Sequence, residues 1–209
     1  MTYEQKSLFN FSKTGDDIRF NTLNEVKEVC KACYKCDLSK SRTQVVFSEG
    51  NPSAKLMLIG EGPGRNEDET GLPFVGRAGK LLDKILLTQN ITREKEIYIC
   101  NIVKCRPPEN RVPTPVEMGA CRVYLEAQIQ LIRPKLILLA GATAVKGVLG
   151  IKEGISKIRG QWFDGPFESK IMPIFHPSYL LRNESKEPGT PKWLMCQDIQ
   201  EVRKSLDAL

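Results

Sequence analysis

The sequence predicts an α/β protein, a three-layer αβα sandwich around a central, mostly parallel four-stranded sheet. Three observations support this fold: four short apolar runs of strand length, helical segments between them, and turns rich in glycine or proline after several of the runs. The chain has 209 residues, of which 41% are hydrophobic and 27% charged, enough for one globular domain with a sizeable core. We expect residues 1–22 to be a polar tail and residues 23–209 to form that single domain.

The predicted elements alternate along the chain. Residues 24–36 have helix-compatible spacing. Apolar strands are expected at residues 55–59, 97–103, 136–140 and 171–175, and further helices at 78–89, 115–132, 142–149 and 191–209. Pro115 suits the first turn of the long helix, and Pro173 favours a sheet edge or a bulge. In such folds ligands bind beyond the carboxyl ends of the strands, so the loops there are expected to carry the chemistry.

Composition and charge exclude several classes of protein. The longest apolar run, residues 136–145, is too short to span a membrane. The N-terminus lacks the apolar stretch of a secretory signal, so we expect a cytoplasmic protein without membrane attachment. The formal net charge of +6 permits a polyanionic partner without demanding one.

The chain has seven cysteines, and an odd number without a secretory signal argues against a disulfide framework. Cys30, Cys33 and Cys36 have the spacing that begins a bacterial ferredoxin run, but the next ligand position in that run is Lys40. A self-contained local cluster is therefore not expected, and further ligands would have to come from elsewhere in the chain.

Two distant cysteines, Cys105 and Cys121, are candidates for those further ligands. Zinc prefers two close pairs, whereas an iron–sulfur cluster tolerates ligands from separate segments. Buried thiols without a ligand role are the alternative. That alternative is preferred for Cys100, inside an apolar strand, and for Cys196, in the last helix.

The turn Gly60-Glu-Gly-Pro-Gly64 follows the first predicted strand but lacks the spacing of a phosphate-binding loop. Its proline also removes one N–H, although the remaining amides can still bind a carbonyl oxygen. Four carboxylates lie in or after this turn: Glu61, Glu67, Asp68 and Glu69. Such a group either performs general base chemistry, or stabilises a positive charge, or is a solvated acidic loop.

His176 is the only histidine, and it directly follows the last predicted strand. A single histidine is more often structural, but this position suits a functional role equally well. The apolar Tyr179 and Leu180 come next, with Arg182 behind them. This pattern is typical either of a buried anchor or of a wedge into a base stack beside a phosphate-binding cation.

Taken together, five stretches resemble the family 4 uracil-DNA glycosylases, the thermostable iron–sulfur type. They run in family order over about 180 residues, from residue 30 to the C-terminus. The stretches are Cys33-x2-Cys36-Asp-Leu, Gly60-Glu-Gly-Pro-Gly-x2-Glu-Asp-x2-Gly-x-Pro-Phe-Val-Gly76, Asn101-Ile-Val-Lys-Cys-Arg-Pro-Pro-x-Asn-Arg111, Cys121, and His176-Pro-Ser-Tyr-Leu-Leu-Arg182.

The resemblance implies a 4Fe–4S cluster held by Cys33, Cys36, Cys105 and Cys121, with Cys30 as an addition that the family pattern does not require. It also implies that the cluster is structural. The cluster would connect the N-terminal helix to the proline-rich loop and the long helix, and so shape the surface that faces DNA.

The resemblance further implies an enzyme that flips uracil out of DNA and hydrolyses the N-glycosidic bond, leaving an abasic site. Phe74 would stack on the flipped ring, and Asn101 would accept a hydrogen bond from N3–H and donate one to O4. The amide of Gly62 and the ring of His176 would bind O2, where charge develops as the base leaves. Glu67 would lie near C5 and exclude the methyl group of thymine.

The same resemblance places Glu61 where family 1 enzymes carry Asp, as a candidate for positioning water or stabilising the sugar cation. Leu180 is the candidate wedge. Phosphate contacts are expected from Arg182, Lys104, Arg106 and Arg111. Uracil-containing DNA, single- or double-stranded, is the expected partner of a monomeric protein.

Two rival functions stay open: a catalytically inert iron–sulfur DNA-binding relative and a small electron-transfer protein. The second has no use for Phe74, Asn101 and His176.

The tail carries one further motif. Gln5, Leu8 and Phe11 resemble the core of sliding-clamp-binding peptides, although Ser12 replaces the usual second aromatic residue. A polar tail with a few packing residues is the alternative to this clamp-binding role.

Overall fold

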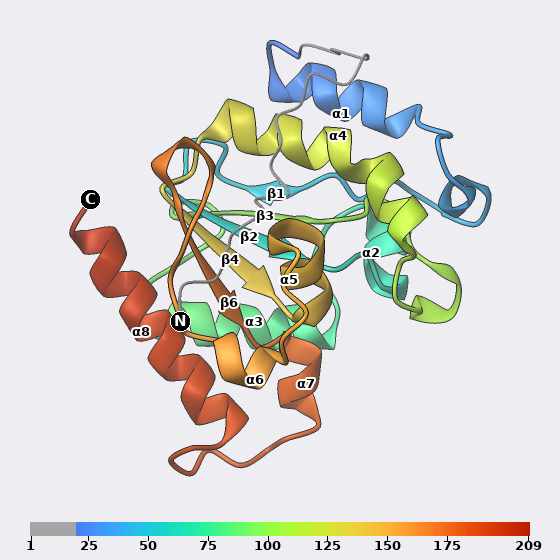
Figure 1. Ribbon diagram of the computed structural model, residues 1–209. Coiled ribbons are helices and arrows are strands. Elements are labelled where there is room, and N and C mark those ends of the chain that lie inside the picture. The colour runs from blue at the N-terminus through green and yellow to red at the C-terminus, as the bar shows by residue number, and fades with distance from the viewer. Residues whose placement is uncertain (1–19) are drawn as a thin grey trace.

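The computed structural model describes residues 20–209 and shows a sheet between two layers of helices (Figure 1). The four expected strands form the parallel centre of the sheet. A two-residue antiparallel strand borders each edge, so the order is β1-β3-β2-β4-β6-β5, with six strands rather than the expected four. The two edge strands were not predicted because a strand of only two residues is too short to show a pattern of hydrophobic residues in the sequence. The bounds are β1 Glu49–Gly50, β2 Leu56–Gly60, β3 Ile97–Asn101, β4 Leu136–Ala140, β5 Phe163–Asp164 and β6 Lys170–Ile174.

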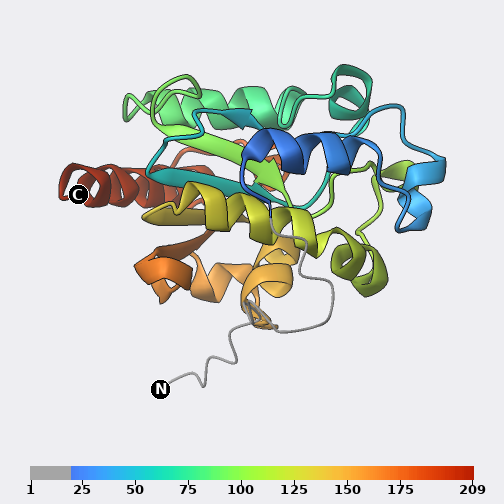
Figure 2. The ribbon, with the colours of Figure 1, turned by 90° about the horizontal axis from the view of Figure 1, so that it is seen from above.

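Helices cover both faces of the sheet, which confirms the three-layer αβα fold. One layer holds α1 (Leu23–Lys31), α4 (Pro115–Ile132) and α5 (Ala142–Leu149), and the other holds α3 (Arg77–Leu87), α7 (Pro177–Leu181) and α8 (Pro191–Asp207). Seen from above, α1 lies alongside α4 (Figure 2). Shorter helical segments lie in the connections: α2 Arg65–Thr70, α6 Ile155–Ile158, η1 Asp37–Lys40, η2 Pro108–Asn110 and η3 Pro166–Glu168.

The core is divided by the sheet into two halves. Every residue of β2, β3 and β4 is buried, which is why these strands are continuous apolar runs in the sequence. Along β2, Met57 and Ile59 pack with the layer of α1, α4 and α5, whereas Leu56 and Leu58 pack with the layer of α3 and α8. This double burial holds the carboxyl ends of the parallel strands rigidly at one edge of the sheet.

Pro173 lies in β6, beyond the point where the short β5 runs alongside. Its carbonyl accepts a hydrogen bond of 2.9 Å from the amide of Gly160, which is not part of the ladder with β4. Because the N and C=O of one residue in a strand point to the same side, the missing N–H removes no bond to β4. The predicted edge therefore exists only locally at Pro173, because β5 and not β6 is the outermost strand of the sheet.

Two helices differ from the prediction. α1 ends at Lys31, so Cys33 and Cys36 lie beyond it rather than inside it. The guanidinium of Arg42 donates to the carbonyls of Cys33 (2.7 Å) and Lys31 (3.2 Å), which satisfies acceptors at this helix end. The segment after His176, expected as a loop, forms α7, with proline in its first turn.

Among residues 20–209, none of the helices combines the length and the apolar character needed to cross a membrane. The proposed clamp-binding residues Gln5, Leu8 and Phe11 lie outside the described part of the chain.

Candidate active site

A pocket of about 260 Å³ opens beyond the carboxyl ends of the parallel strands. Its walls come from the turn after β2, the loop before α3, the end of β3, the proline-rich loop and the start of α7. The structure brings together here all six residues to which the family resemblance gives a role at the base or the reacting bond. They are Glu61, Gly62, Glu67, Phe74, Asn101 and His176.

Asn101 and Phe74 approach each other in this pocket. Asn101 is the last residue of β3, is 2% exposed, and pairs with Gly60 across the sheet. A Cβ at Gly60 would lie 2.4 Å from Asn101 Oδ1 and 2.5 Å from Phe74 Cζ, so glycine is required there. Within the described residues Asn101 Oδ1 has no hydrogen-bond partner. A buried acceptor without a partner is costly, so Asn101 Oδ1 is available to a donor that enters the pocket.

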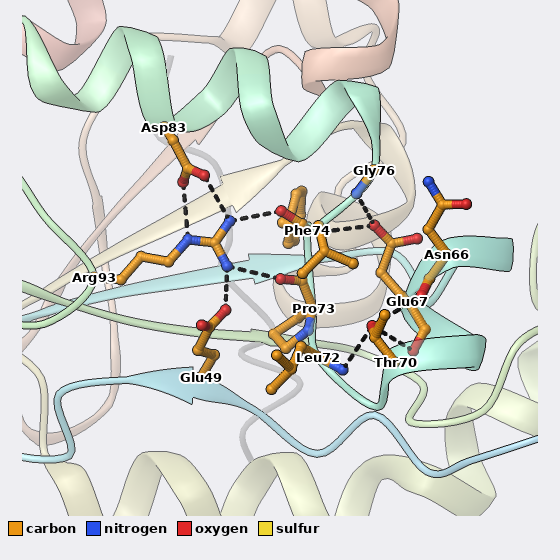
Figure 3. A network of polar contacts seen from close by, with 11 residues as sticks. Glu49, Asn66, Glu67, Thr70, Leu72, Pro73, Phe74, Gly76, Asp83 and Arg93 are labelled. Atoms are coloured by element: carbon orange, nitrogen blue, oxygen red, sulfur yellow. Dashed lines mark hydrogen bonds and ion pairs between the residues drawn. The ribbon is translucent and has the colours of Figure 1, made fainter.

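Glu67 holds the loop that carries Phe74 (Figure 3). Its Oε1 accepts hydrogen bonds from the amides of Val75 and Gly76, both at 2.9 Å, and its Oε2 accepts one of 3.1 Å from Gly64. The carboxylate is therefore fixed on the pocket wall by three backbone amides, while the side chain still lines the pocket.

The other carboxylates of this region have separate environments. Asp68 is 3% exposed and accepts a hydrogen bond of 2.9 Å from the amide of Thr43, so it is structural. Glu69 pairs with Arg65 on the surface. Glu61 is half-buried and lines the pocket. The acidic patch of the sequence is thus divided, with Glu61 and Glu67 in the pocket and the other two outside it.

The imidazole of His176 has a defined tautomer. Its Nδ1 accepts a hydrogen bond of 3.2 Å from the amide of Ser178 and lies 2.7 Å from the Ser178 hydroxyl. Because a backbone amide can only donate, Nδ1 carries the lone pair and the proton resides on Nε2. Burial, and to a smaller extent the charge of Arg182, lowers the pKa of His176 to about 4, against an opposing effect of Glu67. At neutral pH the ring is therefore an uncharged donor in the pocket wall.

Five cysteines line a second cavity, between α1, the loop after β3 and α4. They are Cys30, Cys33, Cys36, Cys105 and Cys121. The remaining two lie elsewhere, as expected: Cys100 is buried within β3 and Cys196 is in α8. Segments far apart in the sequence thus converge on one group of thiols.

N–H groups point at three of these sulfur atoms. Arg42 Nη1 donates to Cys105 Sγ and the amide of Lys104 donates to Cys121 Sγ, both at 3.2 Å. The amide of Lys35 donates to Cys33 Sγ at 3.5 Å. Burial raises the pKa of Cys121 to about 12 and also raises the pKa values of Cys105 and Cys30. Binding of a metal group would therefore displace protons from these thiols.

The donor set of this cavity consists of thiols, which are the usual ligands of iron–sulfur clusters. Among residues 20–209, no three Cys, His, Asp or Glu side chains are arranged to hold one metal ion. The five thiols nevertheless face one cavity, and N–H donors to sulfur are typical of the surroundings of iron–sulfur clusters. The chemistry of the residues present therefore fits such a group.

Two of the predicted DNA contacts are wrong. Lys104 is fully buried, and its ammonium donates to the Asn101 carbonyl (2.7 Å) and to Gln128 Oε1 (2.6 Å), so it cannot reach a phosphate. Leu180 is also fully buried, because α7 turns it into the core between α3 and α8. On the same helix Tyr179 is 39% exposed.

The three arginines that the sequence assigned to phosphate contact all have exposed or partly exposed side chains. Arg182 is exposed beside a neighbouring cavity of about 400 Å³ that shares Glu61 and His176 with the pocket. Arg106 donates to Asn110 Oδ1 (2.8 Å). Arg111 lines the pocket, and its guanidinium binds both oxygens of Glu117 (2.9 and 2.7 Å), which lowers the pKa of that carboxyl to about 2.

Sequence reasoning missed several residues that shape the two cavities. Arg42 contacts Cys33 and Cys105 from the connection after η1, and Ser178 fixes the tautomer of His176. Their roles depend on contacts with backbone or side chains brought close only by the fold. A Pro-Ser pair after a histidine at a strand end is the one local pattern that indicates such a turn.

Comparison with known proteins agrees with this geometry. The family model of the uracil DNA glycosylase superfamily matches residues 47–202. The chain is 48% identical to the type-4 uracil-DNA glycosylase of Thermotoga maritima, over 85% of this chain and 91% of that protein. It is 38% identical to the type-4 uracil-DNA glycosylases of Sulfurisphaera tokodaii (88% and 84% covered) and Archaeoglobus fulgidus (77% and 83%). The chain therefore belongs to the uracil DNA glycosylase superfamily, and within it to the type-4 uracil-DNA glycosylases.

Proposed function

We propose that this protein excises uracil from DNA by hydrolysing the N-glycosidic bond and leaves an abasic site. The observation that carries the proposal is the buried, unpartnered Oδ1 of Asn101 beside the ring of Phe74, in a pocket of nucleobase size. A base inside a duplex cannot reach such a pocket, so the nucleotide must be flipped out of the stack.

Recognition follows from the hydrogen-bonding edge of uracil. N3–H donates to Asn101 Oδ1, and the amide Nδ2 of the same side chain donates to O4. Cytosine presents an acceptor at N3 and a donor at N4, so it would leave the buried amide mispaired. Phe74 supplies a π-face for stacking, which adds affinity without reading the base. Glu67 stands on the pocket wall and limits the space for the methyl group of thymine.

The chemical step depends on stabilising the departing base. As the bond to C1′ breaks, negative charge collects on the uracil ring and at O2. The uncharged Nε2–H of His176 and the amide of Gly62 are donors in the pocket wall that can stabilise this charge. Because both are fixed before the substrate enters, they need no reorganisation during the reaction.

Water has to attack the sugar as it becomes cation-like, and Glu61 is our candidate for positioning that water or stabilising the cation. It is half-buried and lines both the pocket and the neighbouring cavity. Single-turnover excision by Glu61→Gln tests the role. A clear fall in the rate supports it, whereas an unchanged rate removes Glu61 from the mechanism.

The cysteine cavity is proposed to hold a 4Fe–4S cluster through Cys33, Cys36, Cys105 and Cys121. When bound, the cluster would supply a covalent link between the turn after α1, the loop after β3 and α4. The N–H groups of Arg42 and Lys104 that point at sulfur support thiolate ligands. Cys30 faces the same cavity as a fifth thiol.

On the DNA side, Arg106, Arg111 and Arg182 are the proposed phosphate contacts. Tyr179, exposed on α7, replaces Leu180 as the proposed wedge. Removal of a wedge should slow excision from duplex DNA more than from single strands, because only the duplex requires unstacking. Tyr179→Ala tests this assignment, and an equal effect on both substrates would contradict it.

Two further proposals concern partners. The protein is a monomer, and residues Gln5, Leu8 and Phe11 bind a sliding clamp. Deleting residues 1–12 should abolish clamp binding and leave base excision unchanged. No binding by the intact chain would contradict the clamp proposal, and a mass above that of one chain in light scattering would contradict the monomer.

The experiment that tests the function is release of base from a labelled oligonucleotide containing one uracil, in the presence of a chelator such as EDTA. Matched oligonucleotides carry thymine or cytosine at the same position. We expect free uracil and an alkali-labile abasic site from the first oligonucleotide, and no product from the other two. A folded, iron-loaded protein that binds DNA without releasing uracil would be the inert relative instead.

A further inference from the structure

Arg93 lies in the connection between α3 and β3, and all five of its N–H donors are used (Figure 3). Nε and Nη2 bind the two oxygens of Asp83 on α3, at 2.9 and 3.2 Å. Nη1 contacts the carboxylate of Glu49 on β1. The other Nη1 and Nη2 donors bind the carbonyls of Pro73 (2.9 Å) and Phe74 (2.6 Å). The side chain is only 13% exposed.

Arg93 and Glu67 act on the same stretch of backbone from its two sides. Arg93 binds the carbonyls of Pro73 and Phe74, while Glu67 binds the amides of Val75 and Gly76. One polar main-chain group of each of the four consecutive residues 73–76 is therefore held by one of two charged side chains.

The backbone segment that Arg93 and Glu67 bind contains an unfavourable conformation. Phe74 has φ of 54°, in the left-handed region, which a bulky aromatic residue adopts only when its surroundings enforce it. The Phe74 carbonyl also lies so close to α3 that a Cβ at Gly79 would be 1.7 Å from it. The loop is thus pressed against α3, and Arg93 supplies donors to the carbonyl groups of this segment.

We propose that Arg93 is a positioning residue for base recognition: its guanidinium holds Phe74 in the left-handed conformation that turns the ring toward Asn101. The proposal rests on the proposed function, in which this ring stacks on uracil. The carboxylates of Asp83 and Glu49 keep the guanidinium in place. A planar guanidinium can bind two carbonyls and two carboxylates at the same time, whereas the ammonium of a lysine has only three donors and cannot.

The test is a double-mutant cycle between Arg93→Met and Phe74→Ala, measured on the full-length, iron-loaded protein. Stacking contributes to substrate and transition state alike, so Arg93→Met should raise KM about tenfold with little change in kcat. Inhibition by free uracil should weaken by the same factor. In the Phe74→Ala background, Arg93→Met should change neither value by more than about twofold, because the ring it positions is absent.

Arg159 provides a matched control. It is likewise partly buried, at 16% exposed, and is paired with the buried Asp198, but it lines neither the pocket nor the neighbouring cavity. Arg159→Met should lower the melting temperature as Arg93→Met does, yet leave KM and uracil inhibition unchanged. An Arg93→Met protein with wild-type KM, or an equal rise in KM with and without Phe74, would overturn the proposal.

Two milder variants keep the proposal testable should Arg93→Met not fold. Arg93→Lys retains the charge without the fork and should still raise KM severalfold, whereas full recovery of the wild-type KM would overturn the proposal. Asp83→Asn loosens the guanidinium and should raise KM about threefold, again only when Phe74 is present. If the wild-type protein releases no uracil, the proposed function itself fails. If the wild-type protein is active but the variants have its KM, only the proposed role of Arg93 is contradicted.

Discussion

The pocket and the cysteine cavity are built from the same loop, yet they are stabilised differently. Asn101 ends β3 in the pocket, and Cys105 faces the other cavity only four residues later. The pocket walls are fixed by hydrogen bonds within the protein, such as those from backbone amides to Glu67 and His176. The thiols instead come from α1, its following turn, the loop and α4. The comparison indicates a pocket preorganised by the protein's own hydrogen bonds beside a cavity whose thiols are proposed to be joined by a bound cluster.

The largest effect is expected when a thiol of the cysteine cavity is removed. Cys105→Ser removes a proposed ligand, so the brown colour and the four iron atoms per chain should be lost. Since metal binding contributes directly to folding, the melting temperature should fall by roughly 10 °C. Iron analysis, absorbance and calorimetry measure these changes. Cys196→Ser is the matched control, because that thiol lies in α8. Full iron content in Cys105→Ser would contradict the proposed ligand set.

A substitution in the pocket should leave the cysteine cavity intact. Asn101→Asp replaces a donor at O4 by a carboxylate oxygen, so single-turnover excision of uracil should fall about 10³-fold while the iron content stays unchanged. Weak release of cytosine is expected in its place. A wild-type rate on uracil would contradict the role of Asn101, and loss of iron would contradict the independence of the two regions.

Lys104 connects the two regions, so its substitution should affect both of them. Lys104→Met leaves the carbonyl of Asn101 and Gln128 Oε1 without their buried donor. We expect the free energy of unfolding to fall by about 2 kcal/mol and excision to slow about tenfold, because the strand end that carries Asn101 is no longer anchored. Denaturant titration and single-turnover kinetics check this. Lys152→Met, at an exposed position, should change neither quantity; identical behaviour of both variants would contradict the link.

The pocket should also keep His176 neutral. As this is the only histidine, its ring nitrogens can be followed without ambiguity by ¹⁵N NMR. We expect the Nε2–H tautomer and a pKa of about 4, against 6.5 for an ordinary histidine. Between these two pH values His176 is protonated in the unfolded chain but stays neutral in the folded chain. The free energy of unfolding therefore decreases as the pH falls from 6.5 to 4. Titration near 6.5, or the Nδ1–H tautomer, would contradict this environment.

The smallest effect is expected on the outer surface. Arg182→Ala should weaken DNA binding only about threefold and reduce the slope of log K against log salt by about 1. The measurement is a binding titration between about 50 and about 200 mM salt. Lys27, exposed on α1, gives the control variant Lys27→Ala, which should leave the slope unchanged. The same slope for Arg182→Ala and wild type would remove Arg182 from the interface.

The fold and the pocket were largely predictable because their determinants are local. Buried parallel strands are apolar runs, and the residues at their carboxyl ends, Asn101 and His176, had to meet at one edge of the sheet. The burial of Lys104 and Leu180 was not predictable, because a charged or apolar residue in a connection gives no local indication of which way it turns. Arg93 was missed for the same reason: it binds Pro73 and Phe74 about 20 residues earlier in the chain.

A crystal structure of the protein with free uracil bound would show directly how Asn101 and Phe74 contact the base. We propose that Asn101 reads the uracil edge in a pocket that is already formed without ligand. We predict N3 of uracil within hydrogen-bonding distance of Asn101 Oδ1, the ring stacked on Phe74, O2 near His176 Nε2, and Phe74 still at positive φ. Uracil bound elsewhere, or in this pocket without contact to Asn101, would contradict the claim.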